Sequence, residues 1–265
     1  MRNVYFKSHK SLIIYTLLFC IVPLIFFIIL FNINFNKSDS NDETKNSEEN
    51  IYYCDDSDKK ETEREEFLKE QYKEKKLIAL TFDDGPGKYT ETLVDELKKR
   101  DVKATFFILG ECASSRQSTV KYIADNGNEI GIHSYVHKLF TRISDEEIEN
   151  QIDKTRNVIY SACDTDINLI RVPYGSINSR ITTVLENNQL TSVLWDVDSK
   201  DWKFKNTNKI YNYTLKRVTG NDIILMHDIY KTSVESAIKL VDTLKSECYT
   251  FVTVSELLHI REISN

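Results

Sequence analysis

The chain has 265 residues, a formal net charge of −6 and 41% hydrophobic residues. This length accommodates one domain of roughly 200 residues with its own core, together with additional segments. The negative net charge lacks the basic footprint that the phosphate backbone of nucleic acids selects. We therefore expect a single folded domain and no nucleic-acid partner.

An almost unbroken apolar run without charged residues covers residues 12–31. A helix needs about 20 such residues to cross a bilayer. Basic residues precede the run and acidic residues follow it, so the positive-inside rule predicts a cytoplasmic segment over 1–11, a transmembrane anchor over 12–33 and an extracellular remainder. A cleaved signal peptide is the alternative, but no A-x-A-like site follows the run. Residues 17–20 resemble a lipoprotein box only weakly, because a small residue is expected at bulky Phe19.

The segment 34–75 is rich in Asn, Ser, Asp, Glu and Lys and poor in apolar residues. Such a segment buries too little surface to offset the loss of chain entropy on folding. We predict an acidic spacer that is disordered or partly helical, since residues 59–76 are good helix formers. The folded domain then covers residues 76–265. The five cysteines include no close-spaced pair typical of a metal knuckle, and their redox state and pairing stay open.

Short apolar runs alternate with amphipathic stretches throughout residues 76–265. The predicted strands are Leu77–Phe82, Ala104–Leu109, Glu129–Ile132, Leu169–Val172, Ser192–Val197, Ile223–Met226 and Tyr249–Val252. Ser144 and Thr253 each open a capping-box pattern, and Gly127 is typical of a helix end. The alternation predicts an α/β fold with a largely parallel sheet, either a (β/α) barrel or an open doubly wound sheet. A barrel is favoured because the polar clusters follow predicted strands, whose carboxyl ends meet at one rim.

Two of these clusters suggest a metal centre. Asp83 and Asp84 follow the first strand; they form either a solvated turn or a pair in which one carboxylate binds a cation and the other handles a proton. His133 and His137 have the i, i+4 spacing that stacks two imidazoles on a helical turn, although surface histidines are the alternative. Two His and one Asp leave the fourth position of a zinc-like site open, as in catalytic sites.

Three further segments end predicted strands, and each taken alone has an ordinary structural interpretation. They are a Pro-Gly turn at 171–175, a polar loop at 198–202 and a core strand that ends at His227. Together, however, the five segments resemble the polysaccharide deacetylases of carbohydrate esterase family 4, the NodB-homology domain. The motifs T-F-D-D-G-P, H-[ST]-x-x-H, R-x-P-[YF]-G, D-x-x-D-W and L-x-H occur complete and in order between Thr81 and His227. The resemblance implies a distorted (β/α) barrel with a groove for polysaccharide.

The resemblance also implies roles for the residues that move protons or bind a cation. It assigns Asp84, His133 and His137 as ligands of a divalent metal. It assigns Asp83 as the general base and His227 as the general acid that protonates the departing amine. The ligand types favour zinc, while cobalt, nickel and similar ions also fit.

The remaining implied roles belong to residues around these groups. Arg171 would orient the general base and Asp201 the general acid. The backbone N–H of Tyr174 would face the developing oxyanion, and Trp202 and Leu225 would line the pocket for the sugar and the acetyl methyl group.

The function that the resemblance implies is hydrolysis of N-acetyl groups on a cell-surface polysaccharide. An anchor and a short spacer would place the domain at the wall, so we expect N-acetylglucosamine of peptidoglycan as the substrate. N-acetylmuramic acid, chitin-like oligomers, an exopolysaccharide and acetylated xylan stay as alternatives within the class. A catalytically silent glycan-binding module and a metal-dependent peptidase are the alternatives outside it; no H-E-x-x-H motif supports the peptidase. The sequence does not indicate an oligomeric state.

Overall fold

The computed structural model of the protein describes residues 56–264. The predicted cytoplasmic segment 1–11, the predicted anchor 12–33 and residues 34–55 of the predicted spacer lie outside these residues. Within 56–264, no helix combines the length and the apolar character that crossing a bilayer requires. The described part of the spacer is mostly helix α2 (Asp56–Tyr72), whose described side chains are largely exposed.

A parallel sheet of eight strands forms the centre of the domain. The strands are β1 (Lys76–Gly85), β2 (Thr105–Ile108), β3 (Glu129–Ile132), β4 (Leu169–Ile170), β5 (Thr191–Ser192), β6 (Val197–Asp198), β7 (Asp222–His227) and β8 (Tyr249–Val252). Their order is β5-β4-β3-β2-β1-β7-β6, and β8 pairs with the first half of β1. No strand pairing among the described residues joins β5 to β6, so the sheet is a half-barrel. The predicted parallel α/β fold is confirmed.

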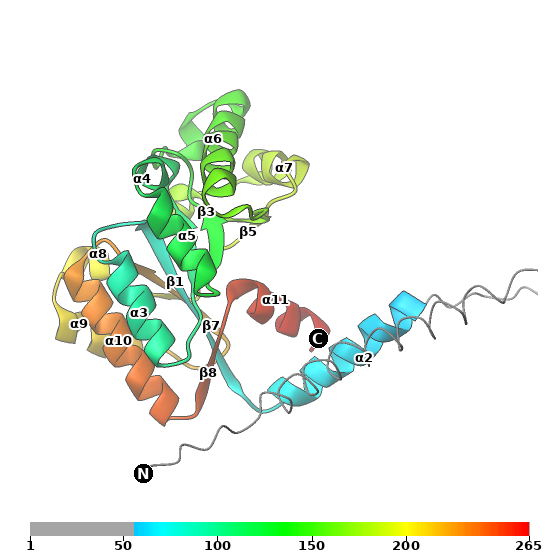
Figure 1. Ribbon diagram of the computed structural model, residues 1–265, viewed down its shortest axis with the longest axis vertical. Coiled ribbons are helices and arrows are strands. Elements are labelled where there is room, and N and C mark those ends of the chain that lie inside the picture. The colour runs from blue at the N-terminus through cyan, green and yellow to red at the C-terminus, as the bar shows by residue number, and fades with distance from the viewer. Residues whose placement is uncertain (1–55, 265) are drawn as a thin grey trace, which may run out of the picture. The chain divides into compact units, whose positions relative to one another are not determined.

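Helices follow most strands, and most of these helices cover the outer face of the sheet. They are α3 (Thr90–Lys99), α4 (Gly110–Ser115), α5 (Gln117–Asp125), α6 (Asp145–Cys163), α7 (Ser179–Asn187), α8 (Asp201–Phe204), α9 (Thr207–Leu215), α10 (Lys231–Ser246) and α11 (Val254–Ile263), with 3₁₀ turns at Phe140–Arg142 and Pro173–Gly175. The side chains of Ser144 and Thr253 cap α6 and α11 as predicted. Helices α3, α9 and α10 lie on one side of β1, and α11 lies on the other (Figure 1).

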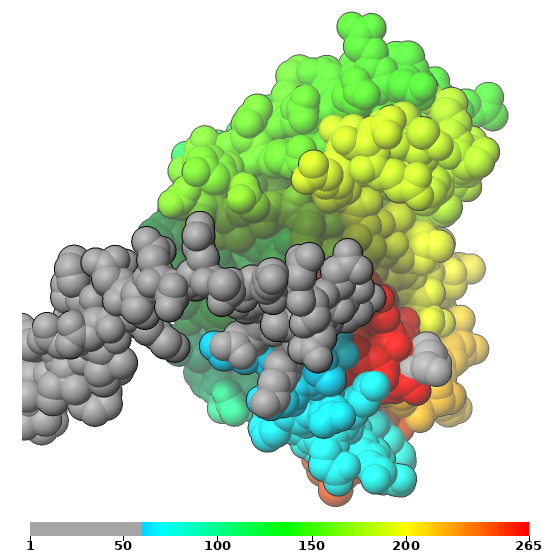
Figure 2. Space-filling model, turned by 90° about the vertical axis from the view of Figure 1, so that its right-hand side faces the viewer, coloured from blue at the N-terminus to red at the C-terminus, as the bar shows by residue number. Residues whose placement is uncertain are grey.

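The two faces of β1 show how the sheet positions a site. Successive side chains of a strand point to opposite faces. Ile78, Leu80 and Phe82 pack into the large core beneath the outer helices. Leu77 and Ala79 point inward, into a smaller core that also contains residues of α11. Figure 2 shows α11, in red, beside the cyan residues at the start of the described chain. The same inward alternation continues to Thr81 and Asp83, so the inner face of β1 is apolar at its start and polar at its carboxyl end.

The prediction of a single strand over Ser192–Val197 is wrong. Strand β5 pairs with β4 at one end of the sheet, and β6 pairs with β7 at the other end. The intervening residues 193–196 cross between these two ends and are not part of a strand. The carbonyl oxygens of Val193 and Leu194 accept hydrogen bonds from the side chain of Arg171 instead. Hydrogen bonds from the side chain of Arg171, which is distant in sequence, therefore replace some of the hydrogen bonds that a continuous strand would make with its neighbour.

Candidate active site

A pocket of about 480 Å³ lies at the carboxyl ends of β1, β3 and β7. It is lined by Asp83, Asp84, His133, His137, Tyr174, Trp195, Asp198, Lys200, Trp202, Leu225 and His227. Every site residue predicted from the sequence lines this pocket except Arg171 and Asp201, which are fully buried and contact lining residues. The structure therefore brings all of the predicted site residues together.

A buried arginine fixes Asp83 at the end of the inner face of β1. Arg171 Nη1 donates hydrogen bonds to Asp83 Oδ1 and to Thr81 Oγ1, both at 2.7 Å. The guanidinium also lies over the ring of Phe107, 4.2 Å from its centroid. Burial lowers the pKa of Arg171 below its ordinary value, although the charge of Asp83 acts in the opposite direction. Asp83 is thus held through Oδ1 by a cation that has almost no contact with solvent.

Asp84, His133 and His137 form a cluster with the donor atoms of a metal site. Both His133 Nε2 and His137 Nε2 lie 3.6 Å from Asp84 Oδ1, and one ligand atom from each residue lies within 4.8 Å of the others. His133 Nδ1 donates to the carbonyl oxygen of Arg171 at 2.6 Å, which leaves Nε2 unprotonated in the neutral ring. Burial, followed by the charge of His133, lowers the pKa of His137, which favours the neutral imidazole that binds metals.

These residues fit a divalent cation. Asp84 Oδ1 is buried and has no hydrogen-bond partner in the described part of the chain. A buried carboxylate oxygen without a partner is costly unless a cation or another donor satisfies it. Ligand atoms placed tetrahedrally at zinc bond lengths lie about 3.4 Å apart. Asp84 Oδ1 lies 3.6 Å from each of the two imidazole nitrogens, which is close to this spacing. An Asp/His/His set of this kind suits zinc and similar ions.

The predicted helical turn between the two histidines is wrong. Ser134 and His137 have left-handed backbone angles (φ 73° and 55°), so the segment is a loop. Ser134 Oγ accepts the backbone N–H of His137 at 2.9 Å. Buried Gln151 of α6 accepts the backbone N–H groups of residues 135 and 136 through Oε1, each at 3.0 Å. The loop still brings both imidazoles to Asp84, and Gln151 is a supporting residue that no sequence signal indicated.

A second charged pair holds His227 at the end of β7. Asp201 Oδ1 accepts a hydrogen bond from His227 Nδ1 at 2.8 Å, and Asp201 Oδ2 accepts the backbone N–H of His227 at 2.7 Å. Burial alone would lower the pKa of His227, but the hydrogen bond and charge of Asp201, together with Asp83 and Asp84, raise it to about 9. The raised pKa favours the imidazolium form, and His227 Nε2 lies 3.8 Å from Asp84 Oδ2.

Aromatic side chains form the rim of the pocket. Tyr174 and Trp202 are 65% and 47% exposed, which is unusual for large rings and leaves them free to contact a ligand. The Tyr174 ring meets the His137 ring edge-on, with centroids 4.5 Å apart. Leu225 is buried in the wall. Trp195, which was not predicted, also lines the pocket, because the crossing segment 193–196 passes this rim.

Buried Asp228 is another residue that the sequence analysis missed. Thr90 Oγ1 donates to Asp228 Oδ2, and Asp228 Oδ1 has no partner among the described residues. Burial raises the pKa of Asp228 to about 7. A Cβ atom on Gly85 would lie 2.5 Å from both carboxylate oxygens of Asp228, so only glycine fits between Asp84 and Pro86. Asp228 thus packs against the turn that carries Asp84.

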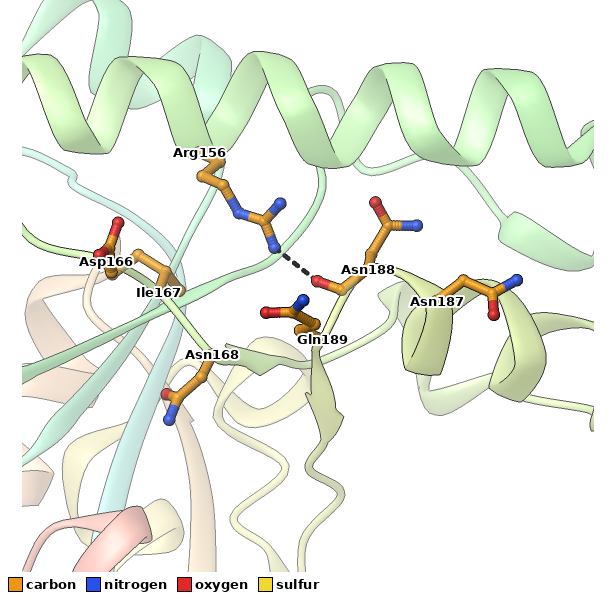
Figure 3. A pocket seen from close by; sticks show the side chains of 7 residues that line it. All are labelled: Arg156, Asp166, Ile167, Asn168, Asn187, Asn188 and Gln189. Carbon is orange, nitrogen blue, oxygen red and sulfur yellow. Dashed lines mark hydrogen bonds between the residues drawn. The ribbon is translucent and has the colours of Figure 1, made fainter.

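A second hollow of about 540 Å³ lies at the opposite edge of the sheet, where β4 and β5 begin (Figure 3). Arg156, Asp166, Ile167, Asn168, Asn187, Asn188 and Gln189 line it. Arg156 Nη2 donates to the carbonyl oxygen of Asn188 at 2.9 Å. This lining contains no histidine or cysteine. The metal-type cluster therefore belongs to the pocket at the carboxyl ends of the strands.

Three cysteines lie among the described residues, and all three are free thiols: Cys112, Cys163 and Cys248. None of them lines the pocket that contains Asp84. Cys20 and Cys54 lie outside the described residues.

Comparisons with known proteins agree with this site. Residues 70–193 match the family described as polysaccharide deacetylase. Peptidoglycan-N-acetylglucosamine deacetylase PgdA of Listeria monocytogenes is 39% identical over 186 residues, and peptidoglycan-N-acetylmuramic acid deacetylase PdaC of Bacillus subtilis is 38% identical over 188. The matches cover 70% and 71% of this chain but only 39% and 40% of those relatives. The solved structure of PdaC superposes with a TM-score of 0.68 at 37% identity, covering 71% of this chain and 93% of that one. The chain therefore belongs to the polysaccharide deacetylase family.

Proposed function

We propose that the protein is a metal-dependent hydrolase that removes N-acetyl groups from a cell-surface polysaccharide, with N-acetylglucosamine of peptidoglycan as its substrate. The observation that carries this proposal is the arrangement around Asp84. Its Oδ1 lies beside His133 and His137, and its Oδ2 lies beside His227. Asp83 Oδ2 lies 3.8 Å from His133 Nε2, so an acid and a base flank one group of metal-binding atoms.

In the proposed reaction, water adds to the acetyl carbonyl carbon and the C–N bond breaks, which gives acetate and a free amine. Asp84, His133 and His137 would hold the cation, which supplies polarisation of the carbonyl and lowers the pKa of water. Asp83, fixed through Oδ1 by Arg171, accepts the proton of the attacking water at Oδ2. His227 donates the proton at Nε2 to the departing nitrogen, because Asp201 occupies its Nδ1 and keeps it charged.

The remaining pocket residues have roles in binding within this proposal. The backbone N–H of Tyr174 donates to the developing oxyanion, and its left-handed backbone (φ 62°) sets the direction of that peptide. Trp202 and Leu225 contact the sugar face and the acetyl methyl group. Zinc is the favoured cation, with cobalt and nickel as alternatives of matching ligand preference.

We also propose that residues 12–33 anchor the chain in the cell membrane and that residues 34–75 separate this anchor from an extracellular catalytic domain over 76–265. The charge-free apolar run and the acidic segment after it support this arrangement. A protease added to intact cells should remove the catalytic domain while residues 1–11 stay inside. Protection of the whole chain would contradict this topology.

The substrate is tested by mass spectrometry of wall fragments treated with the full-length chain and a divalent metal. Loss of acetyl from N-acetylglucosamine is the expected result. Loss from N-acetylmuramic acid would support the second candidate, which is the activity named for PdaC of B. subtilis. Fragments that keep every acetyl group would contradict the proposal.

A further inference from the structure

Asp84 lies at an irregular point of the sheet. Strand β1 pairs with β2 in register up to Asp83, and the register then shifts between Asp83 and Gly85. Asp84 lies at this bulge with a left-handed backbone (φ 70°). Such a backbone is uncommon for a residue other than glycine and persists where the surrounding structure holds it in place. The position of this proposed metal ligand therefore depends on the groups that hold the bulge.

The loop that follows the bulge is held by one hydroxyl group. Thr90 is the first residue of α3, and its Oγ1 accepts the backbone N–H of Gly87 at 2.7 Å. The same hydroxyl donates to Asp228 Oδ2. Thr90 and Asp228 are both fully buried, so both hydrogen bonds lie in a medium of low dielectric constant, where they are stronger than in water. One hydroxyl group therefore ties the loop after β1 to the loop after β7.

Two glycines let these loops pack closely against each other. A Cβ atom on Gly85 would lie 2.5 Å from both carboxylate oxygens of Asp228, and a Cβ atom on Gly87 would lie 2.9 Å from Ile229 Cγ2. The loop after β1 therefore has no room for a side chain at either position. The helices that follow the two loops, α3 and α10, lie on the same side of β1 (Figure 1). Hydrogen bonding and packing thus act together on the residues next to Asp84.

Asp228 and Thr90 lie outside the pocket and have no part in the proposed reaction. Asp228 nevertheless follows His227 directly, and His227 lies opposite Asp83 in the ladder between β7 and β1. Asp228 therefore lies where the strand that carries the proposed general acid meets the turn that carries Asp84. A buried residue in this place acts on the reaction only through the groups that it holds.

We propose that Asp228 and Thr90 are positioning residues that hold Asp84 in place as a metal ligand. Their hydrogen bond fixes the loop after Asp84, and the Asp228 carboxyl group packs on Gly85, so Asp84 Oδ1 stays beside the two imidazoles. This inference rests on the proposed metal-dependent function. Removing a group that orients a metal ligand from outside the ligand set weakens metal binding roughly 10- to 100-fold. The alternative is that both residues only stabilise the fold.

The test begins with Thr90 in the full-length chain. Thr90→Val keeps the shape of the side chain but removes the hydroxyl, and Thr90→Ser keeps the hydroxyl. Thr214→Val is the matched control, because Thr214 is equally buried and its Oγ1 donates to the carbonyl oxygen of Ile210 within α9. The Kd for Zn²⁺ is measured by competition with a chromophoric chelator. Denaturant unfolding of the metal-free proteins measures stability separately.

We expect Thr90→Val to raise the Kd for Zn²⁺ roughly 10-fold, and Thr90→Ser and Thr214→Val to leave it within about threefold of the wild-type value. Both Thr→Val variants lose a buried hydroxyl group and should unfold at lower denaturant concentration than the wild type. Only Thr90→Val should also lose zinc affinity. With excess zinc, its kcat and KM for acetate release should return to within about threefold of the wild-type values, because the reacting groups are intact.

Variants of Asp228 test the other half of the contact. Asp228→Asn keeps an oxygen that accepts the Thr90 hydroxyl and should leave the Kd for Zn²⁺ within about threefold, whereas Asp228→Ala should raise it as much as Thr90→Val does. Gly85→Ala should also raise the Kd roughly 10-fold, because its methyl group meets the Asp228 carboxyl group. In the Asp228→Ala background the same change should add little, since the atoms that it would meet are gone.

Failure of this inference and failure of the proposed function give different results. If the wild type binds no Zn²⁺, the proposed metal-dependent function itself fails. If the wild type binds Zn²⁺ and Thr90→Val binds it equally well, or Thr214→Val weakens binding as much as Thr90→Val, the inference is overturned while the proposed function stands. Weak binding by Asp228→Asn with full binding by Thr90→Val would assign the effect to the charge of Asp228 and overturn it. Additive effects of Gly85→Ala and Asp228→Ala would also overturn it.

Discussion

Two charged pairs flank the candidate metal ligands, and they are built in opposite ways. In the first, the buried cation Arg171 holds the carboxylate of Asp83. In the second, the buried carboxylate of Asp201 holds the imidazole of His227. Each partner fixes one atom of its residue and leaves another directed at the cluster of Asp84. The fold thus places a proton acceptor on one side of the cluster and a proton donor on the other, and the buried partners that hold them have opposite charges.

The largest loss of activity is expected when one of the metal ligands that lie between the two charged pairs is removed. His133→Ala or His137→Ala takes one donor from a three-residue ligand set, so metal occupancy and acetate release should both fall to background. Metal analysis of the purified variants alongside their rates checks this. Unchanged occupancy in both variants would contradict the assignment of these imidazoles as ligands.

Replacing His227, the proton donor of the second pair, should lower the rate of acetate release without removing the metal. His227→Ala is expected to reduce kcat by on the order of 10²- to 10⁴-fold, because the amine then leaves without general acid catalysis. Its metal content should equal that of the wild type. Asp83→Asn, which removes the proposed proton acceptor of the first pair, is the matched variant and should lower kcat by a similar factor. Equal rates for His227→Ala and the wild type would remove His227 from the mechanism.

The first pair should matter more to stability than the second. Arg171→Met leaves Asp83 buried without its partner and is expected to cost about 3–5 kcal/mol in the free energy of unfolding. Asp201→Asn keeps a side chain able to hydrogen-bond and should cost roughly 1–2 kcal/mol. Denaturant unfolding of the two variants measures the difference. A larger loss of unfolding free energy for Asp201→Asn than for Arg171→Met would contradict this prediction.

The smallest expected effect is a shift in pH dependence. Burial lowers the pKa of His227, but Asp201, together with Asp83 and Asp84, raises it to about 9, so the protonated acid should be lost as the pH rises through that value. In Asp201→Asn the raising charge is absent, the pKa falls, and the alkaline limb of the kcat profile should move to lower pH. An unmoved alkaline limb would show that Asp201 does not set the charge of His227.

The sequence predicted the composition of the site better than its geometry. The strand runs and motif spacing predicted that Asp83, His133, Arg171 and His227 would gather at the carboxyl ends of parallel strands, and they do. These predictions succeed because strand periodicity is a local property. The conformation of the His133–His137 loop and the division of Ser192–Val197 were predicted wrongly. Both depend on side chains from distant segments, Gln151 and Arg171, whose contacts leave no local pattern.

Metal dependence is tested by measuring acetate release from peptidoglycan by the full-length chain before chelation, after chelation and after return of a divalent metal. We expect acetate with an equal amount of new free amine, loss of both on chelation, and recovery of both when the metal is restored. Acetate release that persists undiminished after thorough chelation, or none with metal present, would contradict it.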